Sequence, residues 1–350
     1  MGFEIIEEKK VDGYEKVVVA KVGPKKLKVI VAIHNTNLGP ALGGVRMYPY
    51  ENEEKALTDA LRLARGMSHK ASAAGVSFGG GKAVIIGNPS KDKSPEMWRD
   101  FGKFVDSLNG KYITAEDVGT SLEDMSMVAV ETKYVTGLSE LEGGNGDPSP
   151  VTACGVVWGI RAALKTVFGS DKIRGKKFAV QGLGKVGYSL AKNLAEKGAI
   201  VYVADISEDR VQQSEKELGA IPLDVNEILF ADVDVISPCA LGAVINNETI
   251  PKLKAKIIAG AANNQLADEN KDSKLLEKKG IFYAPDFVIN SGGLICVVGE
   301  ISGYDKAESM KRSKSVYDTI LKIAKIGKKE NITTAQAAIK LAEARIHKGK

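Results

Sequence analysis

The sequence has few of the residues that usually mark a disulfide framework or a metal centre. Its 350 residues include only three histidines and three cysteines, and Cys154, Cys239 and Cys296 lie far apart. An odd, sparse set of cysteines without metal-ligand spacing predicts reduced thiols in a cytoplasmic protein and no bound metal. None of the three histidines occupies a convincing catalytic position, which disfavours a dehydrogenase that uses a histidine base, such as a hydroxy-acid dehydrogenase.

Long apolar runs and a strong excess of one charge are missing as well. No segment approaches the roughly 18 apolar residues of a membrane span, and the acidic start MGFEIIEEKK does not resemble a signal peptide. The 49 basic and 44 acidic residues are spread along the chain, so a net charge of +5 gives no reason to expect nucleic acid. We therefore expect a soluble protein without membrane or nucleic-acid partners.

Length and linker composition predict two domains. A chain of 350 residues exceeds what a single hydrophobic core normally organises. The stretch Gly137–Pro150 is rich in glycine and proline and has no apolar periodicity, which is typical of a linker. We predict an α/β fold with an N-terminal domain over 1–136 and a second domain over 137–324. The C-terminal helix, at about 325–350, is expected to pack back on the first domain.

The stretch Gly66–Lys82 places two lysines among small and apolar residues. Lys82 follows three consecutive glycines and leads directly into a short apolar strand predicted at 83–86. Glycines allow a sharp turn and a close approach of backbone to a ligand, and apolar surroundings lower the pKa of an ammonium group. A helix predicted from the pattern over 51–67 delivers the chain to Lys70. The alternative is a flexible loop with two solvated lysines.

A third candidate, Asp117, is predicted to lie between the end of a strand and the start of a helix. Ser121 and Asp124 have the spacing of a capping box that opens this helix. At this position, the local pattern fits a structural turn aspartate as well as a functional carboxylate.

The clearest motif is Gly182-x-Gly184-x-x-Gly187. It follows an apolar strand at 178–180, opens an amphipathic helix, and precedes a second strand that ends in Asp205. These glycines permit a tight turn and bring a dinucleotide pyrophosphate to the helix N-terminus. Asp205 is suited to accept hydrogen bonds from the ribose hydroxyls and to repel a 2′-phosphate, which favours NAD over NADP.

Further strands in this region have polar or glycine-bearing loops behind them. In a parallel sheet, such loops gather at the carboxyl edge, where ligands bind. Asn263 and Asn264 follow one of these strands, so we interpret them as cofactor contacts, with turn formation as the alternative.

Six collinear motifs resemble the amino-acid dehydrogenases of the glutamate/leucine/phenylalanine/valine group, most closely the leucine-specific members. The resemblance covers nearly the whole chain. The motifs are LGPALGGVRM (Leu38–Met47), MSHKASAAGVSFGGGKAVI (Met67–Ile85), YITAEDVGT (Tyr112–Thr120), QGLGKVG (Gln181–Gly187), AGAANNQL (Ala259–Leu266) and YAPDFVINSGG (Tyr283–Gly293).

This resemblance implies a substrate domain with a mixed sheet, a Rossmann-type NAD-binding domain, and oxidative deamination of an L-amino acid to a 2-oxo acid and ammonia. It implies that Lys82 activates water and polarises the substrate, that Asp117 exchanges protons with the amine, and that Lys70 binds the α-carboxylate. A homo-oligomer is also implied, with an octamer as the first expectation and a dimer as the second. The remaining residues assigned to the cofactor are Leu183, Lys185, Val186, Ile206, Cys239 and Ala240.

Side-chain specificity is expected from the residues at the far end of the substrate. A glutamate-specific member needs a cation there, whereas the corresponding position in this chain is Leu42. An apolar surround favours an aliphatic, branched-chain substrate. Leu294 stands where valine is expected, which leaves the choice among leucine, valine and isoleucine open. Phenylalanine and tryptophan stay open as well. A non-catalytic NAD-binding relative is the other alternative. The remaining residues assigned to the substrate are Gly43, Met67, Ala115, Thr136 and Val297.

Overall fold

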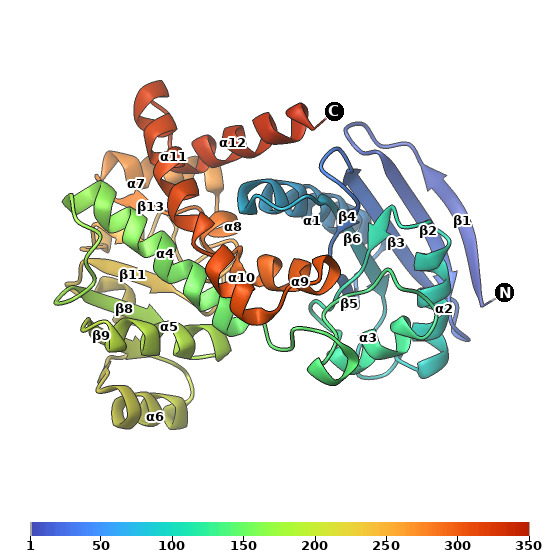
Figure 1. The fold of residues 1–350 in the computed structure, drawn as a ribbon, viewed down its shortest axis with the longest axis horizontal. Helices are drawn as coiled ribbons and strands as arrows, with labels where there is room; N and C mark the ends of the chain where they lie inside the picture. Colours follow the sequence, from blue (N-terminus) through green and yellow to red (C-terminus); the bar gives the residue numbers. More distant parts are fainter. Residues whose placement is uncertain (1, 350) are drawn as a thin grey trace. The chain divides into compact units, whose positions relative to one another are not determined.

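The computed structural model describes residues 2–349, which fold into two compact units (Figure 1). The first unit contains 2–146, Val297–Gly303 and 342–349. The second contains Asp147–Cys296 and Tyr304–Leu341. The main division after Gly146 lies inside the predicted linker, and only the last part of the C-terminal helical region is counted with the first unit.

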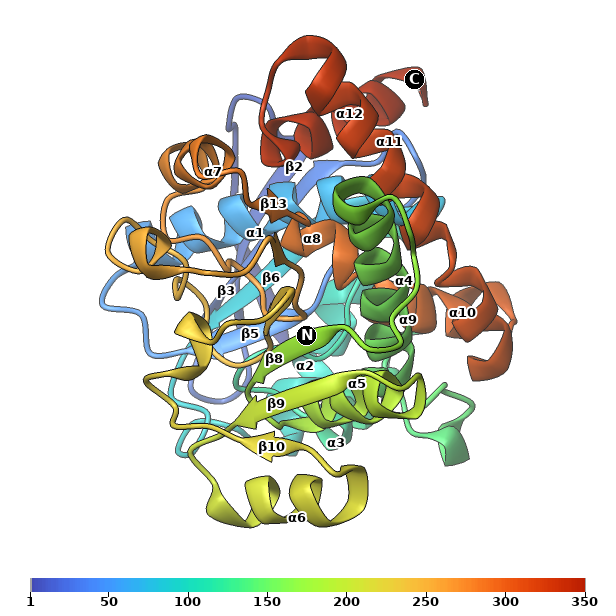
Figure 2. The same ribbon diagram turned by 90° about the vertical axis from the view of Figure 1, so that its left-hand side faces the viewer.

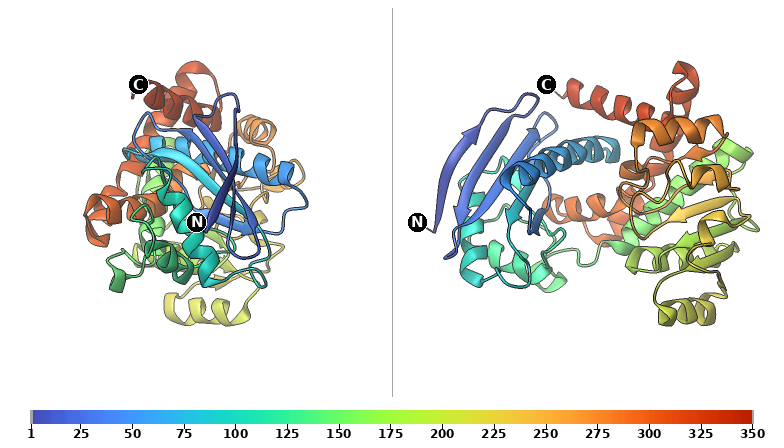
Figure 3. Two further views of the ribbon diagram at one scale, coloured as in Figure 1. Left: turned by 90° about the vertical axis from the view of Figure 1, so that its right-hand side faces the viewer. Right: turned by 180° about the vertical axis from the view of Figure 1, so that it is seen from behind.

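The first unit is built on a mixed sheet of seven strands. From its edge, β1, β2, β3 and β6 are antiparallel neighbours, while β4 and β5 pair with β6 in parallel and β7 pairs with β4 in parallel. The right-hand view of Figure 3 shows this sheet with α1 beside it. The strands are β1 (Phe3–Lys9), β2 (Lys16–Val22), β3 (Leu27–Asn35), β4 (Ala41–Leu42), β5 (Val45–Tyr48), β6 (Gly79–Ile86) and β7 (Tyr112–Ile113).

Alternation along the strands gives this sheet two apolar faces, and each face is covered by helices. One core joins Ala83 and Ile85 of β6 to α2 (Pro95–Asp106) and α3 (Leu122–Ala129). The other joins Val84 to the alanine stripe of α1 (Glu53–Ala74). Because successive strand residues point to opposite faces, Lys82 lies on the same face as Val84, toward α1.

Helix α1 is longer than the sequence pattern predicts. Asn52 caps its start by accepting from the Lys55 N–H, and Gly75 ends it with φ of 77°. The predicted end near residue 67 is wrong because Gly66 does not stop the helix, and the small residues after it continue the turn. Lys70 therefore lies on α1 rather than in a loop behind it.

The second unit contains a parallel six-stranded sheet. Its order, β10-β9-β8-β11-β12-β13, is the 3-2-1-4-5-6 order of a Rossmann fold. Figure 2 shows β8, β9 and β10 beside α5 and α6. The strands are β8 (Lys177–Gln181), β9 (Ile200–Ala204), β10 (Ile221–Pro222), β11 (Val235–Pro238), β12 (Ile257–Ile258) and β13 (Phe282–Tyr283). The predicted pairing of a mixed-sheet domain with a Rossmann-type domain is confirmed.

Helices fill the connections of the second unit. Within 2–349, α4 is the one helix long and apolar enough to cross a membrane, but 61% of its apolar window is buried, as expected of a core helix. The helices are α4 (Ser149–Phe168), α5 (Lys185–Glu196), α6 (Glu208–Leu218), α7 (Glu269–Lys278), α8 (Asp286–Ile289), α9 (Gly292–Ser302), α10 (Lys306–Arg312), α11 (Ser315–Glu330) and α12 (Thr334–Lys348). The last part of α9 and the end of α12 belong to the first unit.

The end of α9 and the end of α12 both form hydrogen bonds within the first unit. The carboxylate of Glu300 on α9 accepts hydrogen bonds from the Thr136 hydroxyl at 2.6 Å and the Gly137 N–H at 2.7 Å. On α12, the Arg345 guanidinium donates to the carbonyls of Ser72 and Val76 at 3.1 and 2.9 Å. At the C-terminus of α1, Arg345 thus adds a charged donor to the Ser72 carbonyl, which also accepts from the Gly75 N–H of the left-handed cap.

Candidate active site

Lys82 and Asp117 form a direct ion pair in the first unit. The Lys82 ammonium donates to Asp117 Oδ2 at 2.6 Å. Lys82 is 5% exposed, because its strand lies inside the sheet and α1 covers the face it points to. The structure therefore brings together the two residues predicted to be catalytic, and it excludes the solvated-loop alternative for Lys82.

Their surroundings change the proton affinities of both groups. Burial lowers the pKa of Lys82 from its ordinary value of 10.5, and the neighbouring Asp117 only partly opposes this effect. Burial alone would raise the pKa of Asp117, but the positive charges of Lys82 and Arg46 outweigh it and lower that pKa. An ionised carboxylate thus faces an amine that loses its proton more easily than a lysine in water.

The loop that carries Asp117 is fixed by its own backbone. The Asp117 N–H donates to Thr120 Oγ1 at 2.8 Å, and the same hydroxyl lies 3.1 Å from the Val45 carbonyl. Gly119 has φ of 80°, and a Cβ there would lie 2.0 Å from the Met47 carbonyl oxygen. The backbone of Asp117 thus forms the turn that the sequence indicated, while its side-chain carboxylate accepts hydrogen bonds from Lys82 and Arg46.

The predicted substrate residues of the first unit surround the start of β6. Leu42 is 1% exposed and pairs with Gly80 across the sheet. A Cβ at Gly43 would lie 1.8 Å from the Gly81 carbonyl and 3.4 Å from Met67 Cγ. Gly43 and Met67 are therefore close to the glycines that precede Lys82. Lys70 follows Met67 by three residues on α1, so both lie on one side of this helix.

The other predicted substrate residues are more dispersed. Ala115 is buried two residues before Asp117, and its carbonyl accepts from the Val45 N–H at 2.8 Å. The Thr136 hydroxyl is 3.2 Å from the Val297 carbonyl, which places these two residues together in the first unit. Leu294 is buried in the second unit, and its predicted substrate contact remains a proposal.

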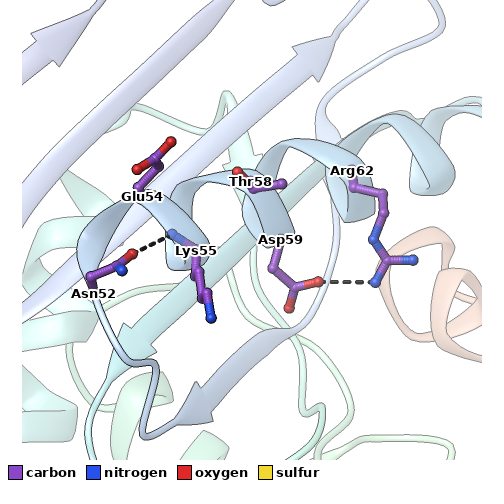
Figure 4. Close-up of a pocket in the computed structure, with 6 residues that line it drawn as sticks. All are labelled: Asn52, Glu54, Lys55, Thr58, Asp59 and Arg62. Carbon is purple, nitrogen blue, oxygen red and sulfur yellow. Dashed lines mark hydrogen bonds and ion pairs between the residues drawn. The ribbon is translucent and has the colours of Figure 1, made fainter.

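A surface pocket lies on the outer side of the first half of α1 (Figure 4). All the residues that line it carry polar or charged groups, which does not suit the apolar side-chain site predicted from Leu42. Asp59 links it to the lysine site, because Asp59 Oδ2 accepts from Arg46 Nη1 at 2.9 Å and Arg46 Nε donates to Asp117 Oδ2 at 2.9 Å. The residues lining the pocket are Asn52, Glu54, Lys55, Thr58, Asp59 and Arg62.

In the second unit, the glycine motif forms the turn between β8 and α5. Gly182 has φ of 93°, and a Cβ at Gly187 would lie 1.9 Å from the Gly182 carbonyl oxygen. At Gly184, the N-cap of α5, a Cβ would meet nothing within 4 Å. The first and third glycines therefore serve chain packing, and the second faces open space at a helix N-terminus, as a bound pyrophosphate requires. Leu183, Lys185 and Val186 belong to the same turn.

Asp205 follows β9 and is held against this turn. Its Oδ2 accepts from the Leu183 N–H at 2.6 Å, and its Oδ1 accepts from the Ser207 N–H at 2.9 Å. Ile206 beside it is 94% exposed, and its predicted cofactor contact stays a prediction. Arg210 lies 3.8 Å from Asp205 Oδ1, so the expected ribose site also has a cation nearby.

The remaining predicted cofactor residues lie behind β11 and β12 at the same carboxyl edge of the sheet. Cys239 and Ala240 follow β11, and desolvation raises the pKa of the Cys239 thiol to about 12. Asn264 has φ of 50°, while Asn263 Oδ1 accepts from the Asn290 side chain at 2.7 Å. Asn264 is thus a turn former by geometry, whether or not it also contacts a cofactor.

Several buried polar atoms near this edge fit a ligand that is rich in hydrogen-bonding groups. Within 2–349, the side-chain oxygens of Gln181 on β8 and Ser237 on β11, and Asn290 Oδ1 behind α8, are buried without a hydrogen-bond partner. A buried polar atom without a hydrogen bond lowers the stability of the fold unless water or a ligand supplies the missing partner. The residues present therefore fit a nicotinamide dinucleotide.

Sequence reasoning missed the polar residues that support these sites. Arg46 and Asp59 were not assigned, nor were Thr120, Arg210 and the buried oxygens at the sheet edge. One signal was available for Arg46, because it is the charged residue between two buried ones, Val45 and Met47, in a short strand. Its partners lie 13 and 71 residues away in the chain and could not be read from spacing.

Comparison with known proteins places the chain in a family. The Glu/Leu/Phe/Val dehydrogenase dimerisation domain matches residues 15–134, and the Glutamate/Leucine/Phenylalanine/Valine dehydrogenase domain matches 143–209 and 202–348. Leucine dehydrogenase of Bacillus cereus is 51% identical over 99% of this chain and 94% of its own length. Phenylalanine dehydrogenase of Caldalkalibacillus thermarum is 49% identical over 92% and 88%.

Solved structures extend the comparison to the fold. The crystal structure of L-tryptophan dehydrogenase from Nostoc punctiforme has a TM-score of 0.87 at 46% identity and covers 96% of this chain and 97% of that one. The chain belongs to the Glu/Leu/Phe/Val dehydrogenase family. It is an amino-acid dehydrogenase, and its reaction is the NAD(P)-dependent oxidative deamination of an amino acid.

Proposed function

We propose that this enzyme oxidatively deaminates an aliphatic, branched-chain L-amino acid with NAD, giving the 2-oxo acid, ammonia and NADH in a reversible reaction. The observation that carries the proposal is the buried pair of Lys82 and Asp117, 2.6 Å apart. An amine with a lowered pKa beside an ionised carboxylate supplies the proton acceptor and the donor that this reaction needs. The enzyme is proposed to be cytoplasmic.

The residues of the first unit divide the chemistry between them. Lys70 anchors the substrate α-carboxylate, which orients the Cα atom and lowers the entropic part of the barrier. Asp117 takes a proton from the substrate ammonium, since only the neutral amine releases a hydride readily. Lys82 then activates the water that attacks the imine and polarises the developing carbonyl. When bound, the nicotinamide dinucleotide accepts the hydride.

The proposed preference for a branched-chain substrate rests on Leu42 and on three further apolar residues assigned to the substrate side chain, Ala115, Leu294 and Val297. Leu42 is buried and uncharged, so a substrate carboxylate at this end would have no counter-ion. The similarity to leucine dehydrogenases supports the same choice. Phenylalanine or tryptophan is the second candidate, supported by relatives at 49% and 47% identity that are named for those substrates.

The proposed preference for NAD rests on Asp205, whose carboxylate would repel a 2′-phosphate. Gly182, Gly184 and Gly187 are proposed to hold the pyrophosphate, and Asn263 and Asn264 to contact the cofactor. The first unit is proposed to be the substrate domain and the place of subunit contact, in keeping with the dimerisation-domain match. We propose a homo-octamer, with a dimer as the alternative, which light scattering distinguishes.

The test is a single variant measured in two ways. Lys82→Ala is expected to lose turnover by about 10²–10⁴-fold, the range of general acid–base groups, while NAD binding measured by calorimetry stays near that of the wild type. A panel of leucine, valine, isoleucine, phenylalanine and tryptophan, followed through NADH absorbance, defines the substrate in the same assay. Near-normal deamination by Lys82→Ala would show that this lysine has no catalytic role.

A further inference from the structure

A chain of alternating charges extends from the lysine site to the surface of α1. Lys82 and Arg46 both donate to Asp117 Oδ2, at 2.6 and 2.9 Å, and Arg46 also donates to Asp59 Oδ2 at 2.9 Å. Asp59 is held in turn by the Tyr50 hydroxyl at 2.7 Å and by Arg62 Nη2 at 2.9 Å. The side chains of Arg46, Asp59 and Asp117 are only 22%, 17% and 24% exposed, so the chain is shielded from solvent along most of its length.

The local fold explains why Arg46 occupies this position. On β5, Val45 and Met47 point into one apolar core, so Arg46 between them points to the opposite face, toward α1. Arg46 pairs with Val84 in parallel register, two residues along β6 from Lys82. A guanidinium there can bridge a carboxylate on α1 and a carboxylate in the loop behind β7, because its N–H groups form a fixed, planar fork.

The consequence for Asp117 is an oriented carboxylate with one oxygen available. Both cations donate to Oδ2, and among residues 2–349 no donor reaches Oδ1. Without Arg46, rotation about the Cβ–Cγ bond would let Lys82 hold either oxygen. We propose that Arg46, fixed in place by Asp59, is a positioning residue that holds Asp117 with Oδ1 directed to the substrate amine. This inference rests on the proposed function of Lys82 and Asp117.

The charges of the chain also predict how each member affects protonation. The charged and titratable groups around Lys82 and Asp117 are Arg46 from β5, Asp59 from α1 and Tyr112 from β7. Tyr50 and Arg62 lie beyond Asp59. The positive charge of Arg46 lowers the pKa of Lys82, whereas the negative charge of Asp59 raises it. Removing Arg46 and removing Asp59 should therefore shift the pH dependence of deamination in opposite directions, although both changes release Asp117.

The experiment compares four variants with the wild type by the pH profile of kcat/KM in deamination. Arg46→Gln and Asp59→Asn should each lower kcat by about 10–100-fold, as expected for a misplaced catalytic group. The rising limb of the profile should move to higher pH in Arg46→Gln and to lower pH in Asp59→Asn. Arg46→Lys should lose rate without a comparable pH shift, since it keeps the charge but cannot bridge both carboxylates.

Arg62→Gln is the matched control, because it removes an exposed partner of Asp59 and leaves the bridge of Arg46 intact. Its kcat should stay within about twofold of the wild type, consistent with the small value of exposed ion pairs. Wild-type rates and unshifted profiles in folded Arg46→Lys and Asp59→Asn would overturn the inference, as would shifts of the same sign in Arg46→Gln and Asp59→Asn. Thermal melting checks folding, and Arg46→Lys carries the test if Arg46→Gln does not fold.

Lys82→Ala belongs in the same panel. If Lys82→Ala loses activity while the Arg46 and Asp59 variants do not, the positioning inference fails and the proposed function stands. If Lys82→Ala keeps its activity, the proposed function itself fails.

Discussion

The two glycine-rich stretches of this protein serve different purposes. In the first unit, Gly79, Gly80 and Gly81 are buried inside strand β6, where added Cβ atoms would lie within 1.9–2.8 Å of neighbouring atoms. In the second unit, Gly184 faces open space at the start of α5. The first stretch lets protein backbone approach protein backbone, and the second leaves room for a ligand. Glycine content alone does not distinguish the two.

This difference in packing separates the predicted proton-transfer site from the predicted phosphate-binding site. The tightly packed glycines bring Lys82 into an interior strand, where burial lowers its pKa, and so they shape a proton-transfer site. The open glycine turn has no titratable group of that kind, and its backbone N–H groups are suited to bind phosphate. Substitutions in the first stretch should damage folding and catalysis together, while substitution of Gly184 in the second should affect cofactor binding alone.

The largest effect is expected from Gly80→Ala. The new Cβ would lie 2.1 Å from Ser68 N and 2.5 Å from the Ala64 carbonyl oxygen, both backbone atoms of α1. Such overpacking costs about 1–3 kcal/mol or more, because α1 must move away from β6. We expect a lower melting temperature and a rise in KM for the amino acid, since α1 carries Lys70. Calorimetry and steady-state kinetics measure both, and an unchanged melting temperature would contradict the packing argument.

A smaller effect is expected from Asp205→Ser. This change removes the charge that repels a 2′-phosphate and leaves Arg210, which lies 3.8 Å from Asp205 Oδ1 in the wild type. We expect the ratio of kcat/KM for NADP to that for NAD to rise by about tenfold or more, equivalent to about 1.4 kcal/mol. The double variant Asp205→Ser/Arg210→Gln should lose the gain. If it keeps the gain, Arg210 does not contribute to cofactor selection.

The smallest effect is expected from Gly184→Ala, for which the fold has room. The melting temperature should stay unchanged, while KM for the dinucleotide rises by about tenfold because the methyl group occupies phosphate space. Gly66→Ala is the matched control, since a Cβ there also meets nothing within 4 Å but lies at an exposed position of α1. It should stabilise the protein by about 0.5–1 kcal/mol and leave both KM values unchanged. An equal loss of dinucleotide affinity in Gly184→Ala and Gly66→Ala would show that the open space at Gly184 is not a phosphate site.

Sequence reasoning succeeded where a motif carried its own context. The strand before Gly182, the helix after Gly187 and the strand ending at Asp205 together specified a Rossmann turn, and the sheet order agrees. It failed at Gly79–Gly81, which we expected to form a sharp turn and which are part of an extended strand. A run of glycines signals close approach, but sequence does not say whether the approaching group is a ligand or another strand.

Contacts distant in sequence account for the other omissions. Lys82 and Asp117 could be proposed as functional because their motifs resemble a known family, but their 2.6 Å contact follows from sheet pairing. Arg46 joins Asp59 and Asp117 only because β5 lies between α1 and the loop behind β7. No local periodicity encodes that arrangement, since it depends on which strands become neighbours.

The hydrogen bonds of Arg345 bear on the order in which the contacts of the first unit form during translation. Arg345 binds the carbonyl of Ala71, which precedes it by 274 residues. At synthesis rates of about 5–20 residues per second, these partners leave the ribosome tens of seconds apart. Until then, the carbonyls of Ala71 and Ser72 accept only from the N–H groups of Val76 and Gly75 in the left-handed cap, and Arg345 adds a second, charged donor. A nascent chain that already contains every predicted catalytic residue therefore still lacks the charged contact that ties the helix of Lys70 to α12.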